Sequence, residues 1–210
     1  MTLFSGQDPW IRLLKNIAAG DGRAPNTVLL EAEGFRQRGG WVIDQQAMDV
    51  MGSPYLLAHG LGVPVADAHT AAELPAAGTY RVWVRTRDWV APWKAPGAPG
   101  RFQVLVGAKP LKTTFGTEGA EWHWQDGGTI ELSAGKVIVA LHDLTGFDGR
   151  CDAVIFTADP DFTPPNNDPA MADFRRKMLG LPGEPEDAGA FDLVVVGGGM
   201  AGCCTAVSAA

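Results

Sequence analysis

From residue 27 to residue 157 the sequence is a succession of short stretches in which apolar and polar residues alternate, and this pattern restricts the fold more than any other feature. In Thr79–Thr86 the side chains of Tyr80, Val82 and Val84 share one face, while arginine and tryptophan side chains share the other. Further strands are predicted at Val28–Glu33, Arg101–Val106, Thr129–Leu132, Lys136–Leu141 and Ala153–Thr157.

Residues that favour turns separate these stretches. They occur at Pro75–Gly78, Pro96–Gly97, Pro99–Gly100, Asp126–Gly128 and Asp148–Gly149. Many short strands with little helix between them indicate two antiparallel sheets packed face to face. We therefore predict a mainly β fold, an antiparallel jelly-roll-like β-sandwich, over residues 27–160.

The flanking segments have a different composition. Residues 1–26 predict a short amphipathic helix at Trp10–Ala19 and a loop. Residues 161–189 are rich in proline, asparagine and acidic side chains and predict a linker. A short helix is expected within it at Pro169–Leu179, with Asp168 as its N-cap and Gly180 as its stop.

The charge of the chain argues against nucleic acid as a partner. Lysine and arginine number 17 and aspartate and glutamate 24, so the net charge is −7, which gives no general attraction to phosphate backbones. No apolar run reaches the roughly 20 residues that span a bilayer. The first residues do not form a secretory signal, which favours the cytoplasm unless the true start lies upstream.

A glycine motif near the end carries the strongest functional signal. The apolar run Leu193–Val196 predicts a buried parallel strand, and Gly197, Gly199 and Gly202 follow with the G-x-G-x-x-G spacing. Such glycines allow a sharp turn, the approach of a pyrophosphate to bare backbone, and close packing of the helix that follows. The predicted cofactor-binding residues are Gly197, Gly198, Gly199, Met200, Ala201 and Gly202. Cys203 and Cys204 are expected to pack between helix and sheet.

Residues 190–210 are therefore expected to be the start of an incomplete α/β dinucleotide-binding domain of the Rossmann type. The acidic residue that holds the ribose should come about 20 residues after the glycines, beyond Ala210. An intramolecular catalytic domain would then follow residue 210. The 210-residue segment alone is expected to be inactive.

The segment from Asp192 to Gly202 resembles the opening of the FAD-dependent oxidoreductase family. The preceding residues resemble the N-terminal extension of some bacterial members. The segments that carry this likeness are Gly39–Gln46, Gly52–Gly60, Tyr80–Trp89 and Leu141–Gly146. The resemblance implies FAD as cofactor, hydride transfer through a flavin, and a small-molecule or glycan-derived substrate.

The start of the β region is similar to carbohydrate-binding β-sandwich modules, in which two glutamates and an aspartate hold a structural calcium ion. The matching residues here are Glu31, Glu33 and Asp152. Period-2 spacing would place Glu31 and Glu33 on one face of a strand, which suits a hard cation with oxygen ligands. The alternative is that these are solvated carboxylates without a metal.

The chain has seven tryptophans, and two of them lie in a proline-rich loop where a ring is harder to bury. Exposed rings of Trp89 and Trp93 could stack on a sugar. Packing is expected for most of the four tryptophans Trp41, Trp83, Trp122 and Trp124. Trp83 could also make cation–π contacts with Arg81 or Arg85.

Two functions remain open from the sequence. The first is the N-terminal part of an FAD-dependent oxidoreductase, in which the sandwich docks on the catalytic domain or presents a glycan. The alternative is a non-enzymatic carbohydrate-binding β-sandwich with an incidental C-terminal segment. A hydrolase accessory domain is a third candidate, and the glycine motif argues against it.

Overall fold

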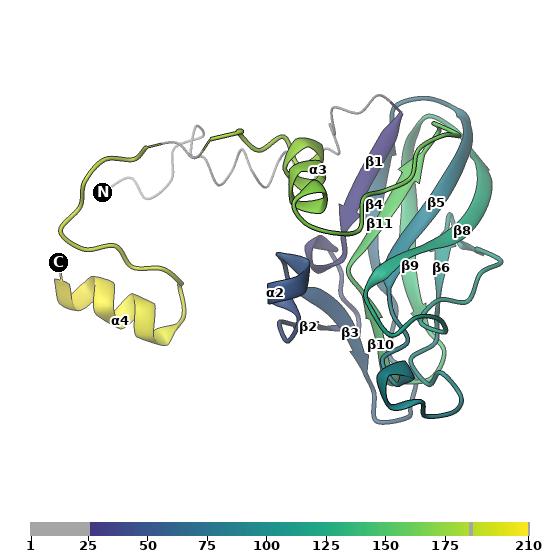
Figure 1. Cartoon of the computed structure of the whole chain (residues 1–210), viewed down its shortest axis with the longest axis horizontal. Helices are drawn as coiled ribbons and strands as arrows, with labels where there is room; N and C mark the ends of the chain where they lie inside the picture. Colours follow the sequence, from purple (N-terminus) through teal and green to yellow (C-terminus); the bar gives the residue numbers. More distant parts are fainter. Residues whose placement is uncertain (1–25, 185–186, 210) are drawn as a thin grey trace.

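A computed structural model describes residues 26–184 and 187–209. The helix expected at Trp10–Ala19 lies outside the described residues. The described part is mainly β, and all of its strand pairs are antiparallel. The strands form a sandwich, as the alternating sequence predicted (Figure 1). No helix among the described residues is long and apolar enough to cross a membrane.

One face of the sandwich is a four-stranded sheet. In spatial order its strands are β1 (Thr27–Glu31), β11 (Ala153–Thr157), β5 (Gly78–Thr86) and β8 (His123–Leu132). Every residue of β1 and β11 is buried, because both faces of this sheet are covered. Their continuous apolar sequences, rather than an alternating pattern, reflect this.

The opposite face is a second four-stranded sheet. Its strands are β4 (Ala68–Leu74), β9 (Gly135–Asp143), β6 (Phe102–Val106) and β7 (Lys109–Pro110). A smaller sheet consists of β10 (Phe147–Cys151), β3 (Tyr55–His59) and β2 (Val42–Asp44). Only Asp152 separates β10 from β11, so at this residue the chain passes from the small sheet into the first one.

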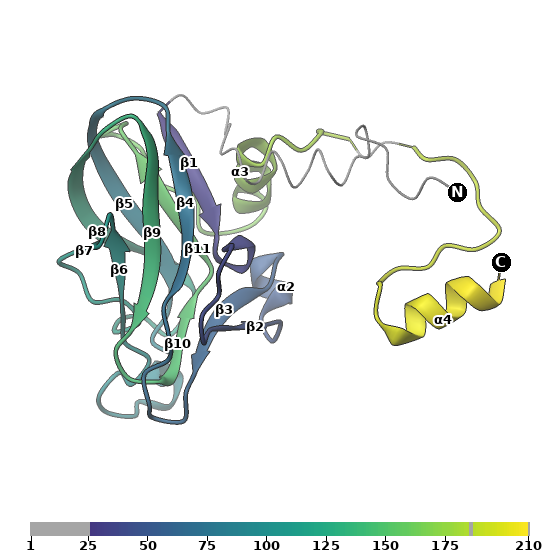
Figure 2. The same cartoon turned by 180° about the vertical axis from the view of Figure 1, so that it is seen from behind.

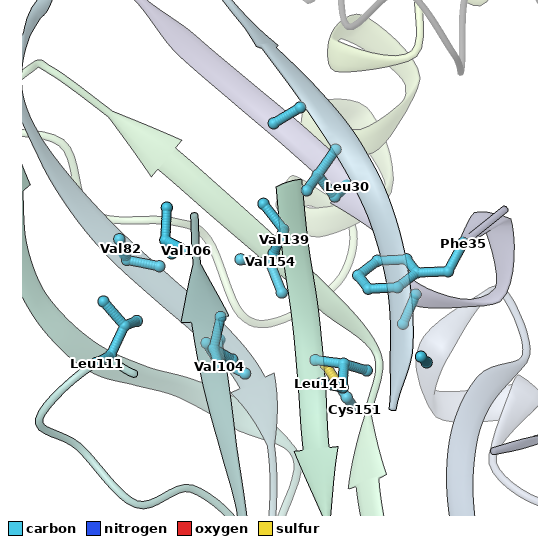
Figure 3. Close-up of a cluster of buried hydrophobic side chains, with 14 of the residues drawn as sticks. Leu30, Phe35, Val82, Val104, Val106, Leu111, Val139, Leu141, Cys151 and Val154 are labelled. Carbon is cyan, nitrogen blue, oxygen red and sulfur yellow. The ribbon is translucent and has the colours of Figure 1, made fainter. Parts of the chain in front are cut away.

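The core lies between the two larger sheets, seen through β6 and β9 in Figure 3. Inward side chains such as Val82 and Val154 of the first sheet meet Val104 and Leu141 of the second. Trp41 is buried in the same core, and its ring meets that of Phe102 edge-on at 5.6 Å between centroids.

Short helical segments complete the described structure. They are η1 (Ala32–Gly34), α2 (Met48–Met51), η2 (Ala91–Trp93), α3 (Ala170–Met178) and α4 (Met200–Ala209). Helix α3 covers the outer face of the first sheet, as both views show (Figures 1 and 2). There Met171 and Met178 are buried against Leu29, Trp124 and Ile155.

The ends of α3 confirm one sequence prediction and correct another. Gly180 has φ +65° and ends the helix, with its N–H bonded to Lys177 O and the N–H of Leu181 bonded to Arg176 O, which is the Schellman arrangement. The N-cap is Pro169 rather than Asp168, and no side chain caps this end.

Two predicted turns lie inside strands. Asp126–Gly128 belongs to β8 and Asp148–Gly149 to β10. The register of the β8–β5 pair shifts between Arg81 and Trp83, and the β10–β3 pair shifts at Gly149. The glycines therefore serve bulges within paired strands rather than chain reversals.

The C-terminal segment does not form the expected start of a Rossmann-like domain. Leu193–Val196 is not a strand, and its side chains are largely exposed, Val196 to 94%. Helix α4 follows the glycines but buries no side chain, and Figure 1 shows it apart from the sandwich. Cys203 and Cys204 are exposed and free, contrary to the expected packing. A parallel strand needs partners on both sides, and the described residues supply none here.

Candidate functional site

The structure brings the three predicted metal-ligating residues together. Glu31 ends β1, Glu33 lies in η1, and Asp152 joins β10 to β11. One carboxylate oxygen from each lies within 4.8 Å of the others. Glu31 and Glu33 do not share the face of a strand, however. The chain turns after Glu31 in η1, where Phe35 N–H bonds to Ala32 O at 3.0 Å, and this turn places Glu33 at the cluster.

Two arginines that the sequence analysis did not identify as site residues complete this carboxylate cluster. Arg85, on β5, donates from Nη1 to Asp152 Oδ2 at 2.9 Å. Arg175, on α3, donates from Nε to Glu31 Oε1 at 2.8 Å and from Nη2 to Glu31 Oε2, so the pair is bidentate. Arg175 Nη2 also reaches Asp152 Oδ1 at 3.1 Å. All four oxygens of Glu31 and Asp152 therefore accept bonds from guanidinium groups.

Burial and charge change the acidity of the cluster. Burial, together with the nearby charge of Glu31, raises the pKa of the Glu33 carboxyl to about 8. Its Oε2 is buried and has no hydrogen-bond partner among the described residues. Burial also raises the pKa of Glu31, and Arg175 opposes that rise. Burial alone would lower the pKa of Arg175, but the bonds and charge of Glu31 outweigh it and raise that pKa.

A second candidate site lies at the loop end of the sandwich, away from α3 (Figures 1 and 2). The rings of Trp89 and Phe147 stack at 5.9 Å between centroids and 20° between planes. Trp93 meets Trp89 edge-on at 6.2 Å and 72°. Trp93 is 70% and Phe147 45% exposed. We call these three residues the aromatic ledge.

Polar groups border the aromatic ledge. The guanidinium carbon of Arg150 lies 5.2 Å from the centre of the Trp89 ring. Asp148 Oδ1 lies 2.6 Å from His59 Nδ1, and both side chains reach solvent. Trp89 Nε1 donates to Phe147 O at 3.0 Å, which joins the loop after β5 to the start of β10. Flat apolar rings beside charged and hydrogen-bonding groups can contact both the C–H face and the hydroxyls of a ligand.

Asp143 holds the loops beneath the ledge in place. It is buried at the end of β9. Its Oδ2 accepts from Val65 N–H at 2.8 Å, and both carboxylate oxygens accept from Gly146 N–H at 2.9–3.0 Å. The same carboxylate therefore fixes the loop between β3 and β4 and the loop between β9 and β10. Phe147 follows Gly146 directly, so its position depends on this network.

The other tryptophans in the described part of the chain mostly pack, as predicted. Trp41 and Trp122 are almost fully buried, and Trp124 is nearly so. Trp83 packs partly against the cluster under α3, and Arg81 lies 4.6 Å from its ring centre, which confirms a cation–π contact. Phe147 was missed because it lies beside a turn-like Asp-Gly pair, and Arg175 because its partner Glu31 is 144 residues away.

The residues of the glycine motif form a tight local turn before α4. Gly197 has φ +103°, and a Cβ on Gly202 would meet Gly197 O at 2.0 Å. A Cβ on Gly198 or Gly199 would meet open space. The turn that the spacing predicted is formed locally, but Met200 and its neighbours are exposed and face no sheet.

No protein-family model matches the chain, and no curated protein matches it by sequence. Solved structures do match. The GH26-CBM35 β-(1,4)-mannanase of Podospora anserina aligns with 67% of this chain at 16% identity and a TM-score of 0.50. This chain covers 29% of that mannanase, less than a third of its length.

Two further similar structures are single modules. A family 35 carbohydrate-binding module of Clostridium thermocellum aligns with 62% of this chain and 96% of its own, at 17% identity and a TM-score of 0.48. CBM35 of Paenibacillus barcinonensis aligns over 63% and 99%, at 16% identity and a TM-score of 0.49. At 16% identity the match to the mannanase concerns the fold alone, which in this chain is an antiparallel β-sandwich.

These findings overturn the expected membership of the FAD-dependent oxidoreductase family. The similar structures named above are a mannanase with a carbohydrate-binding module and two single carbohydrate-binding modules, and none of the three is a flavoprotein. The assignment of the chain to an FAD-dependent oxidoreductase was therefore wrong, while none of these findings tests the cofactor-binding role of Gly197–Gly202, which stays a prediction. The chain has the G-x-G-x-x-G spacing, but the buried strand that precedes these glycines in dinucleotide-binding domains is not formed at Leu193–Val196.

Proposed function

We propose that this chain is a carbohydrate-binding module without catalytic activity, a β-sandwich of the jelly-roll kind that holds a glycan on its aromatic ledge. The observation that carries the proposal is the exposure of Trp93 and Phe147 beside Trp89. Large exposed rings cost free energy in water unless a partner covers them. The similar structures named as carbohydrate-binding modules support the same class of ligand.

A sugar ring suits this surface for physical reasons. Its C–H face can cover an aromatic ring, and its hydroxyls can then bond to groups at the edge. His59, Asp148 and Arg150 lie at that edge. A ligand that was only apolar would make no use of these polar groups.

The first test is gel retardation of the chain by soluble polysaccharides, namely a β-glucan, a galactomannan and a xylan. We expect at least one to retard the chain. Trp93→Ala should weaken that binding about 5- to 30-fold, since stacking on one ring contributes roughly 1–2 kcal/mol. Phe191→Ala is the matched control, because Phe191 is 63% exposed but lies in the C-terminal segment. Phe191→Ala should bind like the unaltered chain.

Two outcomes would contradict the proposal. One is the absence of retardation by all of the polysaccharides and by a wider glycan array. The other is retardation that Trp93→Ala and Phe147→Ala leave unchanged, since both rings are on the exposed side of the ledge.

A further inference from the structure

The carboxylate cluster raises the question of which cation balances it. Three carboxyl groups lie within 4.8 Å of one another, and Asp152 is fully buried. Buried carboxylates of this kind need a nearby cation or strong hydrogen bonds, because water no longer solvates them. Calcium and guanidinium can both meet that need, but they need different surroundings.

Calcium takes six to eight oxygen ligands at about 2.3–2.6 Å. The four oxygens of Glu31 and Asp152 already accept bonds from Arg175 and Arg85. Ser53 Oγ, the nearest hydroxyl of the cluster, accepts from Arg175 Nη2 at 2.8 Å. Only Glu33 retains a carboxylate oxygen without a partner among the described residues. The residues therefore do not fit a calcium ion while Arg175 is in place.

All three guanidinium nitrogens of Arg175 donate hydrogen bonds at or beside this cluster. Its Nε bonds to Glu31, its Nη1 to Met51 O, and its Nη2 to Glu31, Ser53 and Asp152. A planar guanidinium matches a carboxylate with two parallel bonds, which a lysine could not do. Its side chain is only 9% exposed. The contacts come from β1, from the end of α2 and from the β10–β11 junction, so three parts of the fold meet on one side chain.

We propose that the guanidinium of Arg175 is the resident cation of the Glu31–Glu33–Asp152 cluster, which makes the sandwich independent of calcium and makes α3 an integral part of it. Arg175 is carried by α3, whose Met171 and Met178 are buried on the first sheet. The segment before α3 is held as well, since Trp124 Nε1 donates to Pro165 O at 3.0 Å. The sequence analysis predicted a linker at residues 161–189.

The experiment compares thermal unfolding of the full chain in about 1 mM calcium and in excess chelator, with calcium binding followed by calorimetry. The unaltered chain should have the same midpoint in both and take up no calcium. Arg175→Ala leaves the buried carboxylates without their partner and should lower the midpoint in chelator by roughly 10 °C. A hollow of about 350 Å³ lined by Glu31, Glu33 and Arg175 gives an ion access to the cluster. Calcium should therefore restore part of the loss in this variant.

Arg176→Ala is the matched control. Arg176 lies next to Arg175 but pairs with Asp173 at 2.6 Å on the surface of α3. The Arg176→Ala variant should unfold at the same midpoint as the unaltered chain, and calcium should not change that midpoint.

The proposal is overturned if calcium raises the midpoint of the unaltered chain and does so less in Glu33→Gln. It is also overturned if Arg175→Ala unfolds at the same temperature as the unaltered chain. If Arg175→Ala cannot be obtained folded, the calcium response of the unaltered chain still decides, because it needs no variant. Glycan binding is measured separately, so its failure would leave this result unaffected.

Discussion

At the scale of single residues, the carboxyl group of Glu33 is the most unusual feature. It is largely buried beside Glu31, and its pKa is raised to about 8. In the unfolded chain a glutamate has a pKa near 4.5. Between these values the folded chain keeps a proton that the unfolded chain has released, so this residue opposes folding more as the pH rises.

The stability contributed by protonated Glu33 is therefore complete below about pH 4.5 and is lost as the pH rises toward 8. We expect Glu33→Gln, which stays neutral, to be more stable than the unaltered chain at pH 8 by an amount on the order of 3 kcal/mol. At pH 5 the stabilities of Glu33→Gln and of the unaltered chain should differ much less. Urea unfolding at both pH values measures this difference.

Glu73→Gln serves as the control, because Glu73 is exposed on β4. It should change neither the stability nor its dependence on pH. A Glu33→Gln chain that loses stability between pH 5 and pH 8 as steeply as the unaltered chain would show that Glu33 does not carry the effect.

The residues of the site could be predicted from the sequence only where a local signal marks them. A proline-rich loop marked Trp89 and Trp93 as hard to bury, and the structure leaves Trp93 exposed. Glu31 and Glu33 were found by their spacing, although the reason given for it was wrong. Nothing local marks Arg175, because its role depends on contacts with residues more than a hundred positions away.

At the scale of elements, the sequence predicts best where the element is apolar and short. Strand β11, Ala153–Thr157, has the predicted bounds. Strand β4 was missed because its sequence AHTAAEL has few β-branched or aromatic residues. Pairing along its whole length with β9 makes it a strand instead. Leu193–Val196 shows the opposite case, since strong propensity without a partner gives no strand.

The two loops under the aromatic ledge should depend on Gly146. Its φ is +64°, and a Cβ there would lie 1.9 Å from Val63 O. Gly146→Ala should therefore shift the loop that carries Phe147 and weaken glycan binding at least as much as loss of one ring. Gly78→Ala is the control, since a Cβ on Gly78 meets nothing within 4 Å. Binding by gel retardation compares the two variants, and equal binding would contradict the role given to Gly146.

At the scale of the whole molecule, α3 and α4 behave differently. Helix α3 buries Met171, Arg175 and Met178, whereas α4 buries no side chain. A boundary drawn from composition alone placed α3 in a linker, since proline and asparagine surround it. Helix α3 contributes to the stability of the sandwich through the three side chains that it buries. The overall composition of the segment does not reveal them.

Two shortened chains test this difference. A chain ending at residue 183 should unfold at the same temperature as the full chain, since the described residues that it lacks bury no side chain. A chain ending at residue 160 loses α3, and each buried methionine contributes roughly 1.5–3 kcal/mol. It should unfold at a clearly lower temperature or aggregate through the uncovered sheet. Thermal unfolding followed by circular dichroism compares them, and equal midpoints for all three would contradict the assignment of α3 to the sandwich.

The angle within the aromatic ledge restricts the shape of what it can hold. The planes of Trp89 and Trp93 differ by 72°. A flat crystalline fibre could touch only one of these planes at a time, because it has no corner to fill the angle. A chain terminus, a branch point or a single twisted strand of polysaccharide could lean on both. If the ledge binds a glycan as proposed, this geometry favours a soluble or disordered polysaccharide over an ordered surface.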